Sequence, residues 1–504
     1  MHGFARFVVS GFALSCMACT TPPAGGNELG NGETGMTATP ETETGETGET
    51  GGPECSGAWE FGHAIEMPEL PPGDPQAGYE ALITQPYVSC GIPWDFFALA
   101  EGALGSSEPL PGREGKNAMV GHDWTVVTLE DQSELVVSNC LQCHAGYANG
   151  ELMVGLGKAD GDFTTPLSDF ADPLPDLPET SLANAAFNKL KARASILGPY
   201  STMRTIGANP AIMFAIVLLA HRDGPSLAWQ DEPNFELHLD KVVPADPPPW
   251  WRTAKKASHF ANGMSRGDHR GTMVLASSLC TDSIEEAQPV VDYFADVQAY
   301  LQSIEAPPYP FAIDEALAAE GQPLFECHCA GCHGTYADDP ADETYPNLLI
   351  PADIIGTDPA FVTEASEGGV YNTLEDWFND SFYGEFSEVR TADPEPGYTA
   401  PPLDGIWATA PFFHNGSVPS IELVLDSERR PTAWRRVDYD STNFDEDALG
   451  WPWEPAEVHA DAPEADHKYI YDTTQYGHGK GGHTFGDELS ESEREALLEY
   501  LKTL

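Results

Sequence analysis

The motif C-x-x-C-H occurs twice in this chain of 504 residues and constrains its fold more than any other feature. The two copies supply four thiols and two imidazoles, which belong to Cys140, Cys143, His144, Cys329, Cys332 and His333. This spacing is the attachment signature of a c-type haem. Two thiols bond to two vinyl groups of a porphyrin, and the adjacent histidine ligates the iron. The sequence therefore predicts two covalently held haems.

Two other uses of paired cysteines remain as alternatives. A thioredoxin-like dithiol needs a βαβ context, which the neighbouring sequence does not indicate. A zinc ion held by both C-x-x-C pairs is the second alternative. Two copies of the full motif in an exported chain favour haem over both.

The first 54 residues predict an export signal followed by a tether. Residues 1–19 place one Arg before a short apolar run and end with small residues around Cys16 and Cys19, as signal peptides do. Either cysteine is a candidate for the lipid-modified residue of a bacterial lipoprotein. Residues 20–54 are rich in Thr, Glu, Gly and Pro and predict a disordered linker. We expect an exported protein: periplasmic, an outer-membrane lipoprotein, or secreted.

Four of the ten cysteines lie outside the leader and the two motifs, namely Cys55, Cys90, Cys280 and Cys327. Disulfides persist in the compartments that receive exported chains. Four cysteines allow three pairings, and the sequence does not choose between them. Pairing of nearest neighbours, Cys55 with Cys90 and Cys280 with Cys327, is the starting expectation.

The charge balance excludes one class of partner. The chain has 24 basic and 80 acidic residues, which gives a net charge of −56. Nucleic acid is excluded as a partner because binding its phosphates needs clustered Lys and Arg. A solvated acidic surface is the simplest explanation, and such a surface also suits a basic electron-donor protein.

We expect a mainly α fold with two cytochrome c-like haem domains, long loops and a few short strands. The Pro-rich segment 305–310 separates an N-terminal haem domain, residues 55–305, from a C-terminal haem domain, residues 306–504. The apolar segment 211–220 is too short to span a membrane and predicts a buried core helix.

Local patterns in the C-terminal domain predict its two main helices. Gly321, Phe325 and Cys329 share one helical face that leads into the second motif. Ser490 with Glu493 predicts a capping box at the start of the final helix. Two such helices crossing near a haem are typical of cytochrome c domains.

The second axial ligand of each iron decides the function. A six-coordinate iron transfers electrons, whereas an open face binds dioxygen or peroxide. His483 is favoured for the C-terminal haem because it lies in a glycine-rich loop before the final helix and no Met follows Met273, so residues 306–504 contain none. The other candidates are His122, His259, His269, His414 and His478.

Residues 400–425, APPLDGIWATAPFFHNGSVPSIELVL, resemble the C-terminal haem domain of the bacterial di-haem cytochrome c peroxidase superfamily. With residues 247–271 and 481–504, the resemblance is closest to the di-haem rubber oxygenases, which cleave poly(cis-1,4-isoprene) with dioxygen. The resemblance extends over roughly residues 90–504 as scattered motifs.

The resemblance implies distinct roles for the two haems. The N-terminal haem is the reactive one, with His144 as its proximal ligand and oxygen on the opposite face. His333 and His483 are the axial pair of the C-terminal haem, which serves electronically.

The resemblance also implies roles beyond the axial ligands. A tryptophan near the haem edges takes part in the reaction, and Trp250 or Trp251 is the candidate, with an aromatic wedge between domains as the alternative. His414 and Asn415 shape the turn beside the second haem, with plain packing as the alternative. Calcium at the domain interface is a further possibility in the superfamily, but the sequence identifies no ligand set for it.

The sequence therefore predicts a haem-dependent dioxygenase that cleaves an alkene, with O2 and an apolar substrate as partners. Asp404 stands where the peroxidases place Arg or a similar donor, and no distal Glu motif is recognisable. Both departures argue against the first alternative, a peroxidase that uses peroxide and a small electron-donor cytochrome. The second alternative is an electron-transfer cytochrome without catalytic activity.

Overall fold

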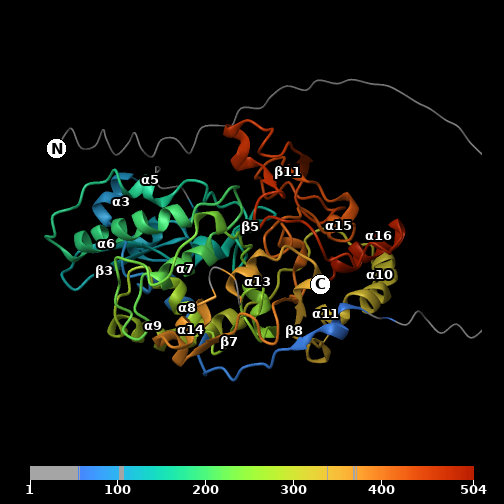
Figure 1. Ribbon diagram of the computed structural model, residues 1–504, viewed down its shortest axis with the longest axis horizontal. Helices are drawn as coiled ribbons and strands as arrows, with labels where there is room; N and C mark the ends of the chain where they lie inside the picture. Colours follow the sequence, from blue (N-terminus) through green and yellow to red (C-terminus); the bar gives the residue numbers. More distant parts are fainter. Residues whose placement is uncertain (1–54, 56, 101–106, 338, 367–368, 370–371) are drawn as a thin grey trace, which may run out of the picture.

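The computed structural model describes residues 55–504 except 56, 101–106, 338, 367–368 and 370–371 (Figure 1). The predicted leader with Cys16 and Cys19, and the linker of residues 20–54, lie outside the described residues. The mainly helical fold with small two- and three-stranded sheets confirms the predicted class. No helix among the described residues has the length and apolar character needed to cross a membrane.

The N-terminal half contains most of the longer helices. Its helices are α2 (Pro75–Thr84), α3 (Trp94–Ala100), α4 (Leu141–His144), α5 (Leu167–Ala171), α6 (Leu182–Leu197), α7 (Ala211–Ala220), α8 (Arg270–Ser277) and α9 (Ile284–Gln302). Its strands are β1 (His63–Ala64), β2 (Ile92–Pro93), β3 (Trp124–Thr128), β4 (Glu134–Ser138), β5 (Ala145–Ala148), β6 (Glu151–Val154) and β7 (Ser265–Gly267). Helix α7 is almost completely buried, which confirms the predicted core helix.

Helices α2 and α9 cross closely in this half. A Cβ at position 78 would lie 1.9 Å from the carbonyl oxygen of Asp296, so glycine is required at the crossing. Phe294 of α9 contacts Tyr87, with ring centroids 5.6 Å apart. The Tyr87 hydroxyl accepts a hydrogen bond of 3.0 Å from the backbone N–H of Cys140. The helix pair thus supports the start of the first motif.

The C-terminal half is built from shorter elements. Its helices are α10 (Glu315–His328), α11 (Ala330–His333), α12 (Ala352–Ile355), α13 (Ala360–Ala365), α14 (Leu374–Asn379), α15 (Ile421–Val424) and α16 (Glu491–Leu501). Its strands are β8 (Leu348–Pro351), β9 (Ser387–Val389), β10 (Gly397–Thr399), β11 (Ala433–Arg436), β12 (Trp453–Pro455) and β13 (Tyr471–Asp472).

Helices α10 and α16 form a second crossing pair next to the second motif (Figure 1). A Cβ at position 321 would lie 2.0 Å from the carbonyl oxygen of Ala496. Phe325 of α10 packs against Tyr500 of α16, with centroids 5.2 Å apart. The capping box of Ser490 and Glu493 is present at the start of α16, as predicted. Each motif therefore has its own helix pair, and each pair crosses at a glycine.

Two large apolar cores meet at the tandem tryptophans. Trp250 belongs to the core of the N-terminal half, and Trp251 belongs to the core of the C-terminal half. The first core also takes in Phe361 and Tyr383 from the later sequence, and the second takes in Leu156 from the earlier sequence. The two halves consequently interlock along the polypeptide that carries the tryptophans.

Both disulfides differ from the expected pairing of sequence neighbours. Cys55 is bonded to Cys327, and Cys90 is bonded to Cys280, across 272 and 190 residues. The expectation was wrong because folding brings the N-terminal segment beside α10 and α11, where β1 pairs with β8 (Figure 1). Trp59 of this segment covers Gly331, since a Cβ at position 331 would lie 2.2 Å from the indole.

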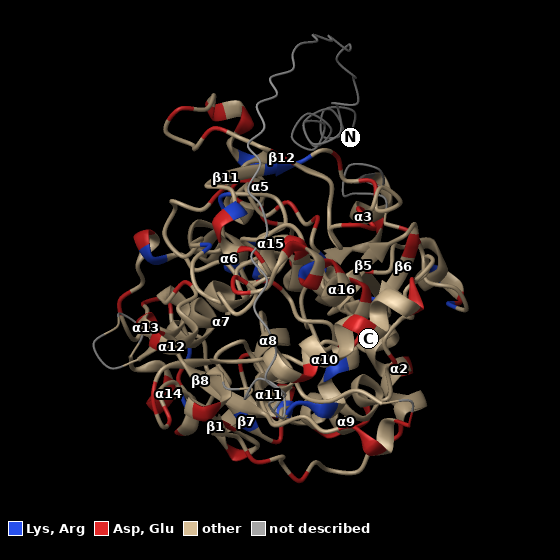
Figure 2. Ribbon diagram, turned by 90° about the vertical axis from the view of Figure 1, so that its right-hand side faces the viewer, with Lys and Arg blue, Asp and Glu red and all other residues tan. Residues whose placement is uncertain are grey.

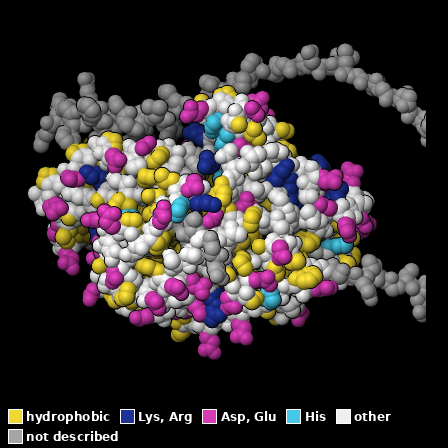
Figure 3. Space-filling model, viewed as in Figure 1, with side chains coloured by type: hydrophobic (Ala, Val, Ile, Leu, Met, Phe, Trp, Pro, Cys, Tyr) yellow, Lys and Arg dark blue, Asp and Glu magenta, His cyan; other side chains and the backbone are white. Residues whose placement is uncertain are grey.

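Acidic residues are distributed over the whole molecule. Figure 2 shows them on helices and loops on all sides of the ribbon, with far fewer basic residues between them. In Figure 3 acidic side chains are spread around the visible face and alternate with hydrophobic ones. On this face the charge forms a general acidic coat.

Candidate haem sites

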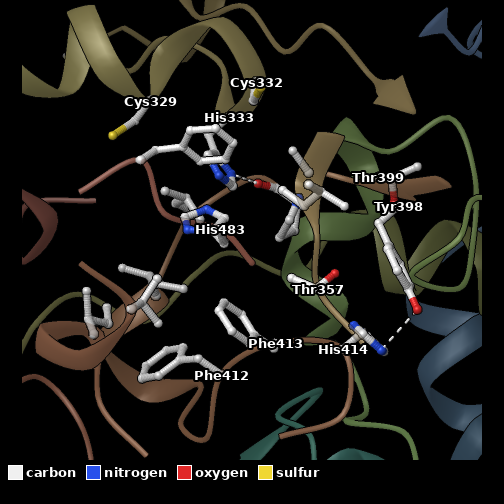
Figure 4. A pocket seen from close by; sticks show the side chains of 18 of the residues that line it. Cys329, Cys332, His333, Thr357, Tyr398, Thr399, Phe412, Phe413, His414 and His483 are labelled. Carbon is white, nitrogen blue, oxygen red and sulfur yellow. Dashed lines mark hydrogen bonds between the residues drawn. The ribbon is translucent and has the colours of Figure 1, made fainter. Parts of the chain in front are cut away.

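A largely apolar cavity adjoins the second motif (Figure 4). Its walls include Cys329 and Cys332, whose thiols are both free, together with His333. Helix α10 ends just before the first of these cysteines, and the short helix α11 presents the second beside the histidine. Two free thiols, an imidazole and an apolar cavity are what covalent attachment of a c-type haem requires, so these residues fit the group.

His333 is held in one orientation by a backbone carbonyl. Its Nδ1–H donates to the carbonyl oxygen of Pro401 at 2.7 Å, which leaves Nε2 as the free ring nitrogen. Such a bond fixes the tautomer and raises the ligand strength of an imidazole. Burial lowers the pKa of His333, so the neutral, metal-binding form is favoured.

His483 lies across the cavity from His333. The backbone of His483 has a φ of 47°, and its N–H donates to the carbonyl oxygen of Ile355 at 2.8 Å. A Cβ at position 482 would lie 2.1 Å from the carbonyl carbon of Gly356, so the glycine-rich loop approaches this backbone closely. Burial, with His333 and Arg430 nearby, lowers the pKa of His483 to about 3.

The two imidazoles are spaced like an axial pair. The ring centroids of His333 and His483 are 6.2 Å apart (Figure 4). With metal–nitrogen bonds of about 2 Å, two imidazoles on opposite faces of one metal ion have centroids about 6 Å apart. This geometry is the one that the expected pairing requires.

Arg430 holds the His483 loop in place and was missed by sequence reasoning. Its guanidinium donates to the carbonyl oxygens of Lys480, Gly482 and His483 and also reaches back to those of Leu423 and Val424. Arg430 is buried, and its cation lies 4.9 Å from the ring of Phe413. The sequence signal for it is only an Arg-Arg-Pro run that follows the segment 400–425.

His414 lines the same cavity but lies apart from the two facing imidazoles (Figure 4). Its ring stacks on Tyr398 at 4.2 Å, and its Nε2 is 3.1 Å from the Tyr398 hydroxyl. Burial lowers the pKa of His414 to about 3. Asn415 donates from Nδ2 to the carbonyl oxygens of Gly477 and Gly479, both at 3.0 Å. The pair thus connects the cavity wall with the loop that leads to His483.

The first motif also presents two free thiols, those of Cys140 and Cys143. Burial raises the pKa of Cys140 to about 11. The His144 ring stacks on Trp250, with centroids 4.8 Å apart and an interplanar angle of 23°. Burial lowers the pKa of His144 to about 4, and its buried Nδ1 lacks a hydrogen-bond partner among the described residues. The donor set again fits a c-type haem.

A stacked histidine pair, of which His269 is buried and His259 is partly buried, adjoins the first motif. The rings of His259 and His269 stack at 3.7 Å, and neither ring nitrogen of His269 has a partner among the described residues. Burial, with His269, Lys256 and His144 nearby, lowers the pKa of His259 well below its usual range. Of the other candidates, His122 and His478 use Nδ1 to bond the carbonyl oxygens of Glu108 and Tyr476.

Asp404 anchors the tandem tryptophans, which gives this departure from the peroxidase pattern a structural role. Its carbonyl oxygen accepts from Trp251 Nε1 at 2.8 Å and from Arg252 Nε at 3.0 Å. Its carboxylate pairs with Lys255 Nζ at 2.6 Å. Trp251, Arg252 and Lys255 belong to the 3₁₀ helix η5 (Trp250–Lys255). This helix therefore places Trp250 at the first site while it is bonded to Asp404 of the C-terminal half.

Clusters of three or more His, Cys, Asp or Glu side chains suited to a metal ion are absent from the part of the chain that the structure describes. The described residues therefore offer no such cluster for calcium.

Comparison with known proteins gives a family match in the C-terminal half. Residues 397–435 match a family model described as RoxA-like, cytochrome c-like. This part of the chain is thus a RoxA-like cytochrome c-like domain, and such a domain implies a c-type haem. It contains the cavity residues Tyr398 and His414.

Two curated relatives come from Sinorhizobium fredii, and both are described as uncharacterized. Protein y4iJ is 29% identical over 248 residues, which is 38% of this chain and 39% of the relative. Protein y4iM is 29% identical over 238 residues, which is 41% of this chain and 53% of the relative. The matched regions span about half or less of these relatives.

Proposed function

We propose that the protein is an exported di-haem c-type oxidoreductase in which the two haems have different tasks. Each C-x-x-C-H motif combines two free thiols with a partly buried imidazole of lowered pKa. The RoxA-like match supports a haem at the second motif. The same donor set at the first motif supports a second haem there.

The observation that carries this proposal is the different partner of each motif histidine. His333 faces the imidazole of His483, which suits a six-coordinate, electron-transferring iron. The aromatic ring found against His144 among the described residues is the indole of Trp250, which does not ligate iron. We propose that an iron on His144 keeps its other face available for a reactant.

The residues around His144 favour a reaction between dioxygen and an apolar substrate. A bound c-type haem supplies an iron able to activate dioxygen. His144 offers a neutral imidazole, and Trp250 fixes its ring plane by stacking. Leu141 and Trp250 connect the first motif with the large apolar core of this half, so an apolar substrate is favoured over a charged one.

We propose that the reaction is oxidative cleavage of an alkene double bond of the polyisoprene type. Dioxygen and the alkene are consumed, and two carbonyl groups form at the cleaved bond. The RoxA-like match and the apolar surroundings of the first site support this choice.

A second candidate function is a peroxidase, which the His259–His269 pair favours. Cleavage of peroxide needs a group that moves a proton at the reacting oxygen. The unpartnered ring nitrogens of His269 lie in the neighbourhood of the first motif and are suited to this task. In that case the haem held by His333 and His483 would pass on an electron supplied by a small cytochrome.

Two measurements on the holoprotein test these proposals. Titration of the reduced protein with carbon monoxide gives one binding haem of two if only the iron on His144 is open. Polyisoprene latex with oxygen is then compared with peroxide plus reduced cytochrome. Product formation from latex supports the dioxygenase, cytochrome oxidation supports the peroxidase, and no carbon monoxide binding with neither activity indicates an electron-transfer protein.

We propose export to the periplasm, with Cys16 or Cys19 as a lipid anchor to the outer membrane. Disulfides Cys55–Cys327 and Cys90–Cys280 are consistent with an extracytoplasmic compartment. Radiolabelled palmitate incorporation that disappears in the C16S/C19S variant is the expected result.

A further inference from the structure

Two basic side chains line the apolar cavity of the second motif. Arg252 and Lys256 follow the tandem tryptophans and belong to the cavity wall, together with the carboxyl of Asp246. Asp246 contributes the one carboxyl among the described residues of this wall. The wall therefore has two cations against a single acid.

Neither cation forms an ion pair among the described residues, although the carboxyls of Asp404 and Asp246 attract the guanidinium of Arg252. Arg252 is 5% exposed and donates to the carbonyl oxygen of Asp404, with a weak contact of 3.5 Å to the hydroxyl of Thr409. Lys256 forms no ion pair there, whereas its neighbour Lys255 pairs with both Glu343 and Asp404. Anions are therefore present beside Lys255, but none of them pairs with Lys256 in the cavity wall.

An unpaired cation in such surroundings is costly. Burial lowers the pKa of Arg252 to about 10 and that of Lys256 to about 8. Burial also raises the pKa of Asp246 well above its usual range, which favours its neutral form. A ligand that brings negative charge into the cavity would remove the cost of both cations.

A tetrapyrrole brings that charge. Its ring fills an apolar cavity, its vinyl edge bonds to the two thiols, and its two propionates are carboxylates away from that edge. We propose that Arg252 and Lys256 bind the propionate carboxylates of the haem attached to Cys329 and Cys332. This inference rests on the proposed presence of a haem at the second motif.

The assignment gives the segment 250–256 a role at both sites. Trp250 stacks on His144 at one end, and the two cations reach the second cavity at the other. A positive charge beside an iron favours the ferrous state because that state carries less positive charge. Removing either cation therefore lowers the midpoint potential of the second haem.

The test uses the R252Q and K256M variants of the full-length holoprotein, with K116M as the control. Lys116 is paired with Glu134 on the surface of the other half, so its removal changes charge without touching the cavity. The readouts are covalent haem content by mass and the midpoint potential of the low-spin haem by spectroelectrochemistry. Neither depends on enzymatic turnover.

We expect R252Q and K256M to keep two haems and to lower this potential by roughly 59 mV, a tenfold change for one electron. The K256R variant should restore the wild-type value, and K116M should match it. Unchanged potentials in R252Q and K256M would overturn the inference. If R252Q fails to fold, K256M decides alone, since its side chain loses no partner found among the described residues. Wild-type protein without haem on Cys329 and Cys332 would instead refute the proposed function.

Discussion

Trp251 donates its indole N–H to the carbonyl oxygen of Asp404 across 2.8 Å, while the adjacent Trp250 stacks on His144. Neighbouring residues of identical type thus have separate tasks. One ties η5 to the C-terminal half, and the other defines the surroundings of the first motif histidine.

This division predicts different effects of the W250F and W251F variants. W251F removes a buried hydrogen bond and leaves the carbonyl of Asp404 with fewer donors, so the free energy of unfolding should fall by about 1–2 kcal/mol. W250F should instead change the spectrum of the carbon monoxide complex at His144. Denaturant unfolding and difference spectra measure the two effects. Identical spectra for W250F and the wild type would contradict the assignment.

Removal of the His483 imidazole should leave the iron of the second haem with a free coordination position. In the H483A variant the imidazole that faces His333 at 6.2 Å is lost, so the second haem should also bind carbon monoxide. Stoichiometry should rise from one to two per chain. The H414F variant is the control, because His414 lies apart from the facing pair and bonds Tyr398. A stoichiometry unchanged in H483A would exclude His483 as a ligand.

Adjacent arginines offer a matched comparison for the loop that carries His483. Arg430 is buried and donates to five backbone carbonyls, so R430M should lower the free energy of unfolding by about 2–4 kcal/mol. Arg429 is exposed and pairs with Glu422, so R429M should change it by less than about 1 kcal/mol. R430M should also weaken the low-spin spectrum of the second haem. Equal stability of the two variants would argue against the loop-holding role.

The crossing of α10 and α16 predicts strict size selection at position 321. A methyl group there would lie 2.0 Å from the carbonyl oxygen of Ala496, so G321A should separate the helices and cost about 1–3 kcal/mol. The neighbouring Gln322 is exposed, and Q322A should stay within about 0.5 kcal/mol of the wild type. Thermal unfolding compares the two. G78A should behave like G321A, because Gly78 lies against Asp296 at the α2–α9 crossing.

Each motif should account for one covalent tetrapyrrole. The C140S/C143S and C329S/C332S variants should each lose the mass of one haem, since the thioether bonds cannot form. Intact mass and pyridine haemochrome absorbance give the count. Wild-type protein with fewer than two haems would refute the di-haem proposal.

Features encoded within a few residues were predicted correctly from the sequence. The capping box of Ser490 and Glu493 and the buried helix at 211–220 depend on local spacing and local apolarity. The distance in space between His333 and His483 cannot be read from the sequence, because the two residues are 150 positions apart in the chain. It depends on how α11 and the glycine-rich loop pack.

Long-range features escaped prediction for the same reason. The disulfide guess used separation in sequence, but Cys55 meets Cys327 only after the N-terminal segment has folded beside α11. The bonds from Arg430 to the His483 loop connect ordinary surface-type residues with backbone carbonyls, which carry no sequence pattern. Asp404 appeared as a departure from a family motif and is an anchor for η5.

The disulfide at Cys327 lies two residues before the first thiol of the second motif. Disulfide formation at Cys327 and thioether formation at Cys329 would therefore involve neighbouring sulfur atoms during maturation. Premature oxidation between Cys327 and Cys329 would consume the thiol that a vinyl group needs, and closure of the N-terminal segment places Trp59 over Gly331 between the attachment cysteines. If a porphyrin is attached to Cys329 and Cys332, we expect its ligation to precede formation of the Cys55–Cys327 bond.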